Sequence, residues 1–139
     1  MANIQIGDRF SREYTFTAER VREFSLAAGD DNPLHLDPEV ATASQYGGLI
    51  ASGTHTTALM LGLTASHFSK LVSVVGKRFT VELKRAVPAD AVVSIEWEIV
   101  QLTARPGRAG RVAHLEGALV DKATGEICVK AVGEVVIEL

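Results

Sequence analysis

Hydrophobic and polar positions alternate along the second half of the chain. Residues 77–85, 92–100 and 127–137 each carry apolar side chains at about every second position. Successive side chains of a β-strand point to opposite faces of a sheet, so this pattern predicts three half-buried strands. Their apolar faces contain Phe79, Val81 and Leu83, then Val93, Ile95, Trp97 and Ile99, and finally Ile127, Val129, Ala131, Val135 and Ile137.

Sequences typical of turns separate these strands. They occupy residues 88–90, 105–108 and 121–125, and each contains proline, glycine or aspartate. Four consecutive strands with short connections are therefore expected, which is typical of an antiparallel meander. A further short strand is expected at residues 3–10.

The first half of the chain predicts helices. Thr17 is a suitable N-cap, and Val21 and Phe24 begin an apolar stripe at helical spacing. Gly29 follows the last periodic residue, as glycine commonly does where a helix ends. A helix is therefore expected over residues 17–28.

Two further helices are expected downstream. Asp37 caps the first, with Pro38 at its first helical position, and it should end before the glycine pair at 47–48. The second covers residues 53–68 and carries no charge between residues 56 and 65. A helix that is apolar on most sides is normally buried, so we expect it to be wrapped by other structure.

Together these elements predict an α+β protein in which an antiparallel sheet wraps around one long helix. The 139 residues favour a single domain spanning positions 1–139. One helix is too small to cover the whole sheet, so dimerisation through a sheet edge or face is expected.

Composition narrows the possible partners. Hydrophobic residues make up 47% and charged residues 22%, and the net charge of −3 gives no reason to expect nucleic-acid binding. The single cysteine, Cys128, excludes an intrachain disulfide and fits a reducing compartment. Neither a signal peptide nor an apolar run of about 18 residues is present, so we expect a soluble, cytoplasmic protein without a membrane partner.

The segment GDDNPLHLD, residues 29–37, carries the first candidate chemistry. Pro33 stiffens the chain and holds Asn32 in an extended conformation. Asp30 and His35 then lie at the two ends of a fixed loop, where they can share one water molecule and move its protons. An ordinary polar turn with a solvated histidine is the alternative, because Asp, Asn and Pro dominate turns.

A second candidate lies where the buried helix begins. Unpaired backbone N–H groups at a helix N-terminus bind oxyanions or carbonyl oxygens, and Gly53 allows a ligand to approach closely. Ser52, Thr54 and His55 are candidates for lining the same pocket. The alternatives are that Ser52 only caps the helix, that Gly53 only permits tight packing, and that His55 is a packed side chain.

Other kinds of site find little support in the sequence. The four histidines have no metal-ligand spacing, and no glycine motif for phosphates is present, so neither a metal nor a cofactor is expected. Arg105, Arg108 and Arg111 form a basic turn. This turn is either a solvated hairpin tip or a contact for the phosphates of a nucleotide-bearing ligand.

Residues 24–35, FSLAAGDDNPLH, resemble the hydratase 2 signature of MaoC-like proteins, which include the (R)-specific enoyl-CoA hydratases. That signature runs aromatic, apolar, small, Gly, Asp, any residue, Asn, Pro, aliphatic, His, and every one of its positions is matched. Residues 46–53, YGGLIASG, also resemble the segment that leads into the family's central helix. The turn at residues 88–90 resembles the family's proline–glycine–aspartate turn.

The resemblance implies a hotdog fold, usually dimeric, and a reversible hydration of trans-2-enoyl thioesters to (R)-3-hydroxyacyl thioesters. It implies that Asp30 and His35 bind and activate the water and that the Gly53 N–H polarises the thioester carbonyl. Asp31 falls on the position where any residue is accepted. The substrate would be an acyl-CoA or an acyl-carrier-protein thioester.

Two departures from the family place the substrate class in question. Many (R)-hydratases have histidine where this chain has Ser52, and some have serine near Leu61. Two competing functions share the same scaffold. One is an acyl-CoA thioesterase and the other a binding protein for acyl thioesters that has no catalytic activity.

Overall fold

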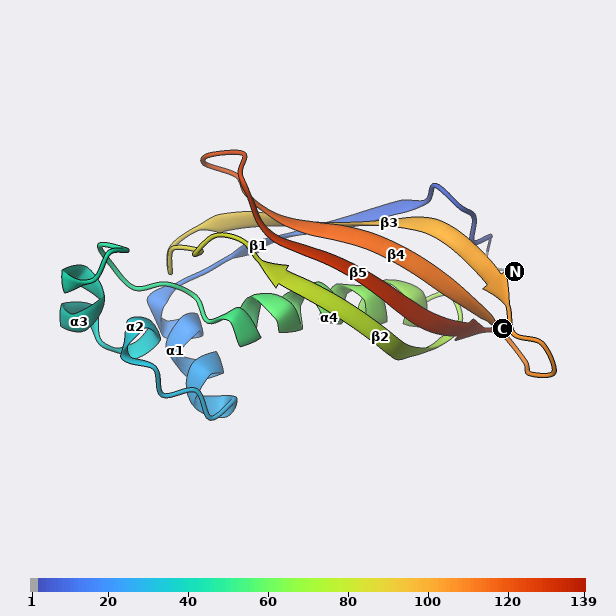
Figure 1. Ribbon diagram of the computed structural model, residues 1–139, viewed down its shortest axis with the longest axis horizontal. Coiled ribbons are helices and arrows are strands. Elements are labelled where there is room, and N and C mark those ends of the chain that lie inside the picture. Colours follow the sequence, from blue (N-terminus) through green and yellow to red (C-terminus); the bar gives the residue numbers. More distant parts are fainter. Residues whose placement is uncertain (1–2) are drawn as a thin grey trace.

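A computed structural model describes residues 3–139 as one five-stranded antiparallel sheet curved around a long helix (Figure 1). The helix contacts all five strands, which is the hotdog architecture that the sequence predicts. The strands are β1 (Arg9–Thr15), β2 (Ser73–Leu83), β3 (Val92–Ala104), β4 (Arg111–Asp121) and β5 (Ile127–Glu138). The helices are α1 (Ala18–Ala27), α2 (Pro33–Leu36), α3 (Pro38–Ala43) and α4 (Gly53–Ser69).

The core lies between α4 and the concave face of the sheet. Met60 and Phe68 of α4 are fully buried, and Trp97 of β3 is 2% exposed. The indole N–H of Trp97 donates a hydrogen bond of 2.9 Å to the Met60 carbonyl, so the large ring reaches the helix without an unpaired polar atom. Each large apolar side chain buried in this way contributes about 1.5–3 kcal/mol to stability.

The predicted meander is wrong in one respect. The strand order is β1-β3-β4-β5-β2, so β2 lies beside β5 and not beside its successor in the chain. The connection between β2 and β3 is not a tight turn. Its Val87 carbonyl accepts a hydrogen bond of 2.8 Å from Ala51 N–H, and Ala89 N–H donates to Leu49 at 3.0 Å, which ties it to the segment before α4.

Two predicted strands have different bounds in the structure. The first strand begins at Arg9 rather than residue 3, because the chain turns at Gly7, which has a φ of +95°. β2 begins at Ser73, four residues before the predicted strand at 77–85. Its register shifts between Gly76 and Arg78, which interrupts the regular alternation that sequence analysis detects.

The short helices α1, α2 and α3 form a separate layer at one end of the sheet (Figure 1). Thr17 caps α1 as predicted, and Asp37 caps α3 with Pro38 at its first position. α2 was not predicted, because its residues were interpreted as a stiff loop. Pro33 in fact begins a helical turn, whose first N–H positions need no partner inside the helix.

α4 is not wrapped on every side, contrary to the sequence-based expectation. Ala58, Gly62 and Ala65 lie on an exposed face of this helix. The neighbouring edge strand β2 also exposes Val75 (62%) and Leu83 (60%). Within residues 3–139, no helix is long and apolar enough to cross a membrane.

Candidate active site

The C-terminal end of α1 positions Asp30. Gly29 adopts a φ of +75°, the left-handed conformation that ends helices. The Asp30 N–H then donates to the Ser25 carbonyl at 2.8 Å, and the Asp30 carboxylate accepts from the Asn32 N–H at 3.1 Å. Both bonds hold Asp30 in place, and its side chain is 28% exposed.

α2 positions His35. The Asn32 side chain caps this turn by accepting from the Leu34 N–H at 3.0 Å, and His35 is 6% exposed. His35 Nδ1 lies 2.8 Å from the Ile50 carbonyl, which can only accept a hydrogen bond. Nδ1 therefore carries the proton, and in the neutral ring Nε2 presents a lone pair.

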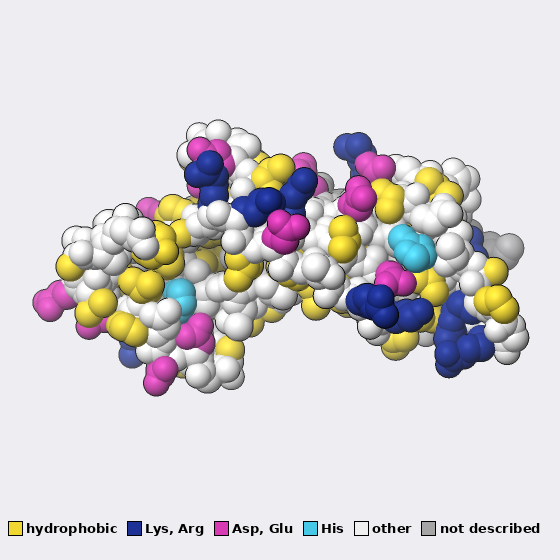
Figure 2. All heavy atoms as spheres, in the orientation of Figure 1, with side chains coloured by type: hydrophobic (Ala, Val, Ile, Leu, Met, Phe, Trp, Pro, Cys, Tyr) yellow, Lys and Arg dark blue, Asp and Glu magenta, His cyan; other side chains and the backbone are white. Residues whose placement is uncertain are grey.

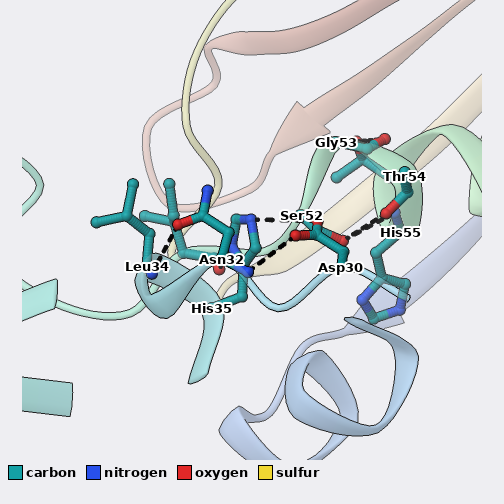
Figure 3. A network of polar contacts seen from close by, with 10 residues as sticks. Asp30, Asn32, Leu34, His35, Ser52, Gly53, Thr54 and His55 are labelled. Atoms are coloured by element: carbon teal, nitrogen blue, oxygen red, sulfur yellow. Dashed lines mark hydrogen bonds and ion pairs between the residues drawn. The ribbon is translucent and has the colours of Figure 1, made fainter. Parts of the chain in front are cut away.

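The Nε2 edge of the His35 ring and the carboxylate of Asp30 face one another (Figure 3). His35 Nε2 and Asp30 Oδ2 are 3.6 Å apart, which is long for a direct hydrogen bond. A polar separation of this length suits a water molecule that contacts both groups. The structure thus brings together the two residues that the sequence motif singled out.

Gly53 is the first residue of α4, so its N–H has no acceptor within the helix. Outside the helix, this N–H makes no hydrogen bond to a backbone carbonyl of residues 3–139. A Cβ at this position would lie 2.5 Å from Leu83 Cδ1, so only glycine leaves the space beside this N–H open. The N–H at the mouth of the helix is therefore available to an external oxygen.

A pocket of about 330 Å³ lies beside two of these groups, because His35 and Gly53 both line it. Asp30 is not among its lining residues, and the β2–β3 connection supplies a further part of the wall. Sequence analysis missed this wall, since nothing local in residues 84–91 indicates that they fold back onto the start of α4. The apolar part of the lining consists of Ile50, Ala51, Leu83, Ala86, Val87 and Val129.

The other predicted pocket residues, Ser52, Thr54 and His55, neighbour Gly53 in the sequence, but none of them is among the residues that line the pocket. Ser52 is fully buried and caps α4, because its hydroxyl accepts from the His55 N–H at 3.1 Å. Its oxygen also lies 2.9 Å from the Thr54 hydroxyl. These side chains therefore satisfy one another at the helix start, and Thr54 is exposed.

His55 packs into an aromatic cluster and is 3% exposed. Its ring stacks on Phe24 at 4.4 Å, lies edge-on to Phe16, and approaches the Tyr14 hydroxyl through Nε2 at 3.2 Å. Burial lowers the pKa of His55 below its usual value, because the charged ring loses its hydration. His55 is thus a neutral ring behind the start of α4.

The basic turn lies away from this site. Arg105 and Arg108 belong to the β3–β4 hairpin, whose tip lies at the end of the sheet opposite the layer of α1, α2 and α3 (Figure 1). Among residues 3–139, no group of His, Cys, Asp and Glu side chains is arranged to hold a metal ion.

Residues 2–121 match a family model described as a MaoC like domain. The chain belongs to the MaoC-like dehydratase family. The match includes the whole of the pocket described above except Val129, so the motif and its geometry both fall within the family domain.

Solved structures of MaoC-like type share the fold. The unliganded R-hydratase PhaJ1 of Pseudomonas aeruginosa has a TM-score of 0.85 at 19% identity, covering 97% of this chain and 83% of that one. The (R)-hydratase of A. caviae involved in PHA biosynthesis has a TM-score of 0.85 at 23% identity, covering 97% of this chain and 98% of that one. At these identities the likeness shows the hotdog fold.

A curated relative matches over a shorter segment. It is a UPF0336 protein of Streptomyces avermitilis, 44% identical over 46 residues. The match covers 33% of this chain and 31% of that protein, so it spans about a third of each.

Proposed function

We propose that this MaoC-like protein is an (R)-specific enoyl-thioester hydratase that acts reversibly on trans-2-enoyl-CoA or the corresponding carrier-protein thioester. The proposal depends mainly on one observation, the 3.6 Å separation of Asp30 Oδ2 from His35 Nε2 beside the open Gly53 N–H. Addition of water to an activated double bond requires groups that move the protons of the water and a donor that stabilises the developing oxyanion. Asp30 and His35 can supply the first, and the Gly53 N–H the second.

In the proposed reaction Asp30 is the principal base and His35 orients the water. The bond from His35 Nδ1–H to the Ile50 carbonyl leaves Nε2 to accept one hydrogen of the water. Asp30 removes the other hydrogen as a proton, and the hydroxide adds to Cβ of the substrate. The electron pair of the double bond moves to the thioester carbonyl, which becomes an enolate.

The Gly53 N–H stabilises the negative charge on the enolate oxygen. Loss of one such donor typically costs about 3–4 kcal/mol of barrier height. The proton held by Asp30 then returns to Cα, with His35 assisting, so that one water is added in total. The hydroxide and the proton of one water then reach the same face of the substrate, which gives syn addition. By analogy with the family, the product is the R alcohol.

The apolar walls of the pocket suit the acyl chain. Leu83, Val87 and Val129 line it together with His35 and Gly53. The first turn of α4, which carries the Gly53 N–H, is held by its neighbours. Ser52 and Thr54 contact one another through their hydroxyls, Ser52 caps the helix, and His55 packs into the aromatic cluster.

A screen of short-, medium- and long-chain enoyl-CoAs tests the proposal. Loss of the enoyl absorbance, followed by chiral analysis of the alcohol, is expected to show hydration to the R product. Release of free thiol from saturated acyl-CoAs would instead support a thioesterase. Binding of enoyl-CoA without any change in absorbance would support a non-catalytic acyl-thioester binder.

We further propose that the protein forms a homodimer through the β2 edge and the open face of α4. β2 lies at the edge of the sheet and exposes Val75 by 62%. Beside it, α4 presents small side chains at Ala58, Gly62 and Ala65, against which a second helix can pack closely. An unpaired edge strand with exposed apolar side chains is a template for pairing with another chain.

Sedimentation equilibrium tests the dimer. The wild-type protein is expected to sediment as a dimer, and Val75→Lys as a monomer, because a lysine on an edge strand opposes strand pairing. A monomeric wild-type protein would contradict the proposal.

A further inference from the structure

The pocket that contains His35 and Gly53 also has two cationic residues that the proposed reaction does not use. Lys84 and Arg85 line it, and no acidic residue within positions 3–139 does. The lining residues therefore carry two positive charges, each paired with a carboxylate that is not itself part of the lining. Cations that line a small pocket attract an anionic part of the ligand.

The backbone of this basic pair is fixed. The N–H groups of Lys84 and Arg85 both donate to the Cys128 carbonyl, at 2.8 and 3.1 Å. The side chains remain partly open to solvent, with exposures of 43% for Lys84 and 62% for Arg85. The two cations are therefore partly exposed at the mouth of the pocket, whereas Ala51, Val87 and Val129 of its lining are buried.

Carboxylates orient these side chains without using all of their donors. Lys84 Nζ lies 3.2 Å from Glu82, and Arg85 Nε lies 2.8 Å from Glu126. An arginine has five N–H donors and one carboxylate can engage only some of them, so the Arg85 guanidinium can bind a second anion at the same time. A guanidinium suits phosphate and carboxylate oxygens because two parallel N–H groups match their spacing.

The basic turn of the β3–β4 hairpin is too far from the pocket to bind an anion there within the same chain. Figure 2 shows Lys and Arg side chains gathered at the end of the molecule where this hairpin lies, and Figure 1 places that end opposite α1, α2 and α3. Within one chain the basic turn is therefore far from the pocket, whereas Lys84 and Arg85 line it.

We propose that Lys84 and Arg85 bind an anionic group of the thioester substrate at the mouth of the pocket. The phosphate of the phosphopantetheine arm is the favoured source, because the apolar interior takes the acyl chain and the arm leaves through the mouth. A carboxylate on the acyl chain has the same chemistry, and the test below separates the two. The inference depends on the proposed function in that the pocket must take a thioester.

Calorimetric titration with saturated thioesters tests the site without turnover. The probes are butyryl-CoA, butyryl-pantetheine, which has no phosphate, and succinyl-pantetheine, which carries only a carboxylate. Lys84→Gln and Arg85→Gln are each expected to weaken butyryl-CoA binding by about tenfold or more, as for the loss of a charge-assisted hydrogen bond. Binding of butyryl-pantetheine is expected to stay within about twofold of wild type.

Two control variants isolate the effect. Lys130→Gln removes the same charge from an exposed position on β5 outside the pocket, and should leave all three affinities unchanged. Glu126→Gln breaks the ion pair of Arg85 but keeps the cation, so butyryl-CoA binding should be retained or strengthened. A loss in Glu126→Gln equal to that in Arg85→Gln would assign the effect to local structure and overturn the proposal.

The remaining outcomes are also decisive. If Lys84→Gln and Arg85→Gln lose affinity only for succinyl-pantetheine, the anion site stands and its ligand is a carboxylate on the acyl chain. Equal weakening for all three probes, or none for any, overturns the site. If enoyl-CoA is not hydrated but the phosphate-dependent pattern is seen, the anion site stands and the hydratase fails. If enoyl-CoA is hydrated but Lys84→Gln and Arg85→Gln leave the three affinities unchanged, the hydratase proposal stands and the anion site fails.

Discussion

The substitution Gly53→Ala separates the function of this residue from its contribution to stability. Gly53 begins α4 with a negative φ, so alanine can adopt the same backbone conformation. The added methyl group would lie 2.5 Å from Leu83 Cδ1, and the next nearest atoms are 3.7 Å away. Leu83 is 60% exposed, so the end of its side chain can rotate away.

The expected change in stability is therefore small. Rotating Leu83 off its preferred rotamer costs about 0.5–1.5 kcal/mol. Replacing glycine by alanine in a helix offsets this by up to about 1 kcal/mol. The free energy of unfolding should stay within about 1 kcal/mol of wild type.

The expected change in activity is much larger, because the methyl group would occupy the pocket beside the N–H that is proposed to bind the thioester oxygen. Displacement of the oxygen from this donor should lower kcat on crotonyl-CoA by about 100-fold to 1,000-fold. The assay combines urea denaturation with the rate of loss of enoyl absorbance.

Ser69→Ala is the control in the same helix. Ser69 is exposed at the end of α4 opposite Gly53, and its hydroxyl makes a long contact of 3.4 Å to the Ser66 carbonyl. This variant should keep stability within about 0.5 kcal/mol of wild type and keep wild-type activity. A folded Gly53→Ala protein with wild-type kcat would refute the assignment of Gly53 to the thioester carbonyl.

Three further substitutions test the surroundings of the site. Ser52→Ala removes the cap of α4 and should cost about 1 kcal/mol in urea denaturation; an unchanged midpoint would show that the cap contributes nothing. Gly117→Ala places a Cβ 2.5 Å from the buried Trp97 ring and should cost about 1–3 kcal/mol, whereas wild-type stability would mean that the ring can shift. Burial lowers the pKa of His55, so the neutral ring stabilises the fold fully above the unfolded-state pKa of about 6.5. This stabilisation is lost as the pH falls below that value, because the unfolded chain then binds the proton more readily. The urea midpoint should therefore fall between about pH 7.5 and 5.5, and less steeply in His55→Phe; an equal slope in both proteins would contradict this role.

Local patterns in the sequence identify most of the secondary structure. The alternation along residues 92–100 and 127–137 reports the side of the sheet that faces α4, which is why β3 and β5 were found. Thr17 and Asp37 mark helix starts because a side-chain oxygen must satisfy the first free N–H groups. These signals depend only on neighbouring residues.

The position of β2 could not be predicted in the same way. Its partner is β5, more than forty residues further along the chain, and strand pairing over such a separation leaves no local trace. The fold of the β2–β3 connection, which contributes Val87 to the pocket, cannot be predicted for the same reason.

The candidate site shows a similar division. Asp30 and His35 were identifiable because the motif spaces them on one stiff segment. The tautomer of His35 was not, since it depends on the Ile50 carbonyl fifteen residues away. The aromatic surroundings of His55 come from β1 and α1, so its orientation also follows only from the fold.

A double-mutant cycle in kcat on crotonyl-CoA tests most directly whether Asp30 and His35 act on one shared water. Asp30→Asn and His35→Gln are each expected to lower kcat by at least about 100-fold. The double variant should fall only about as far as the worse single variant, because residues that act as a unit are strongly non-additive. Wild-type kcat in either folded single variant, or a double loss equal to the product of the two single losses, would contradict the shared water.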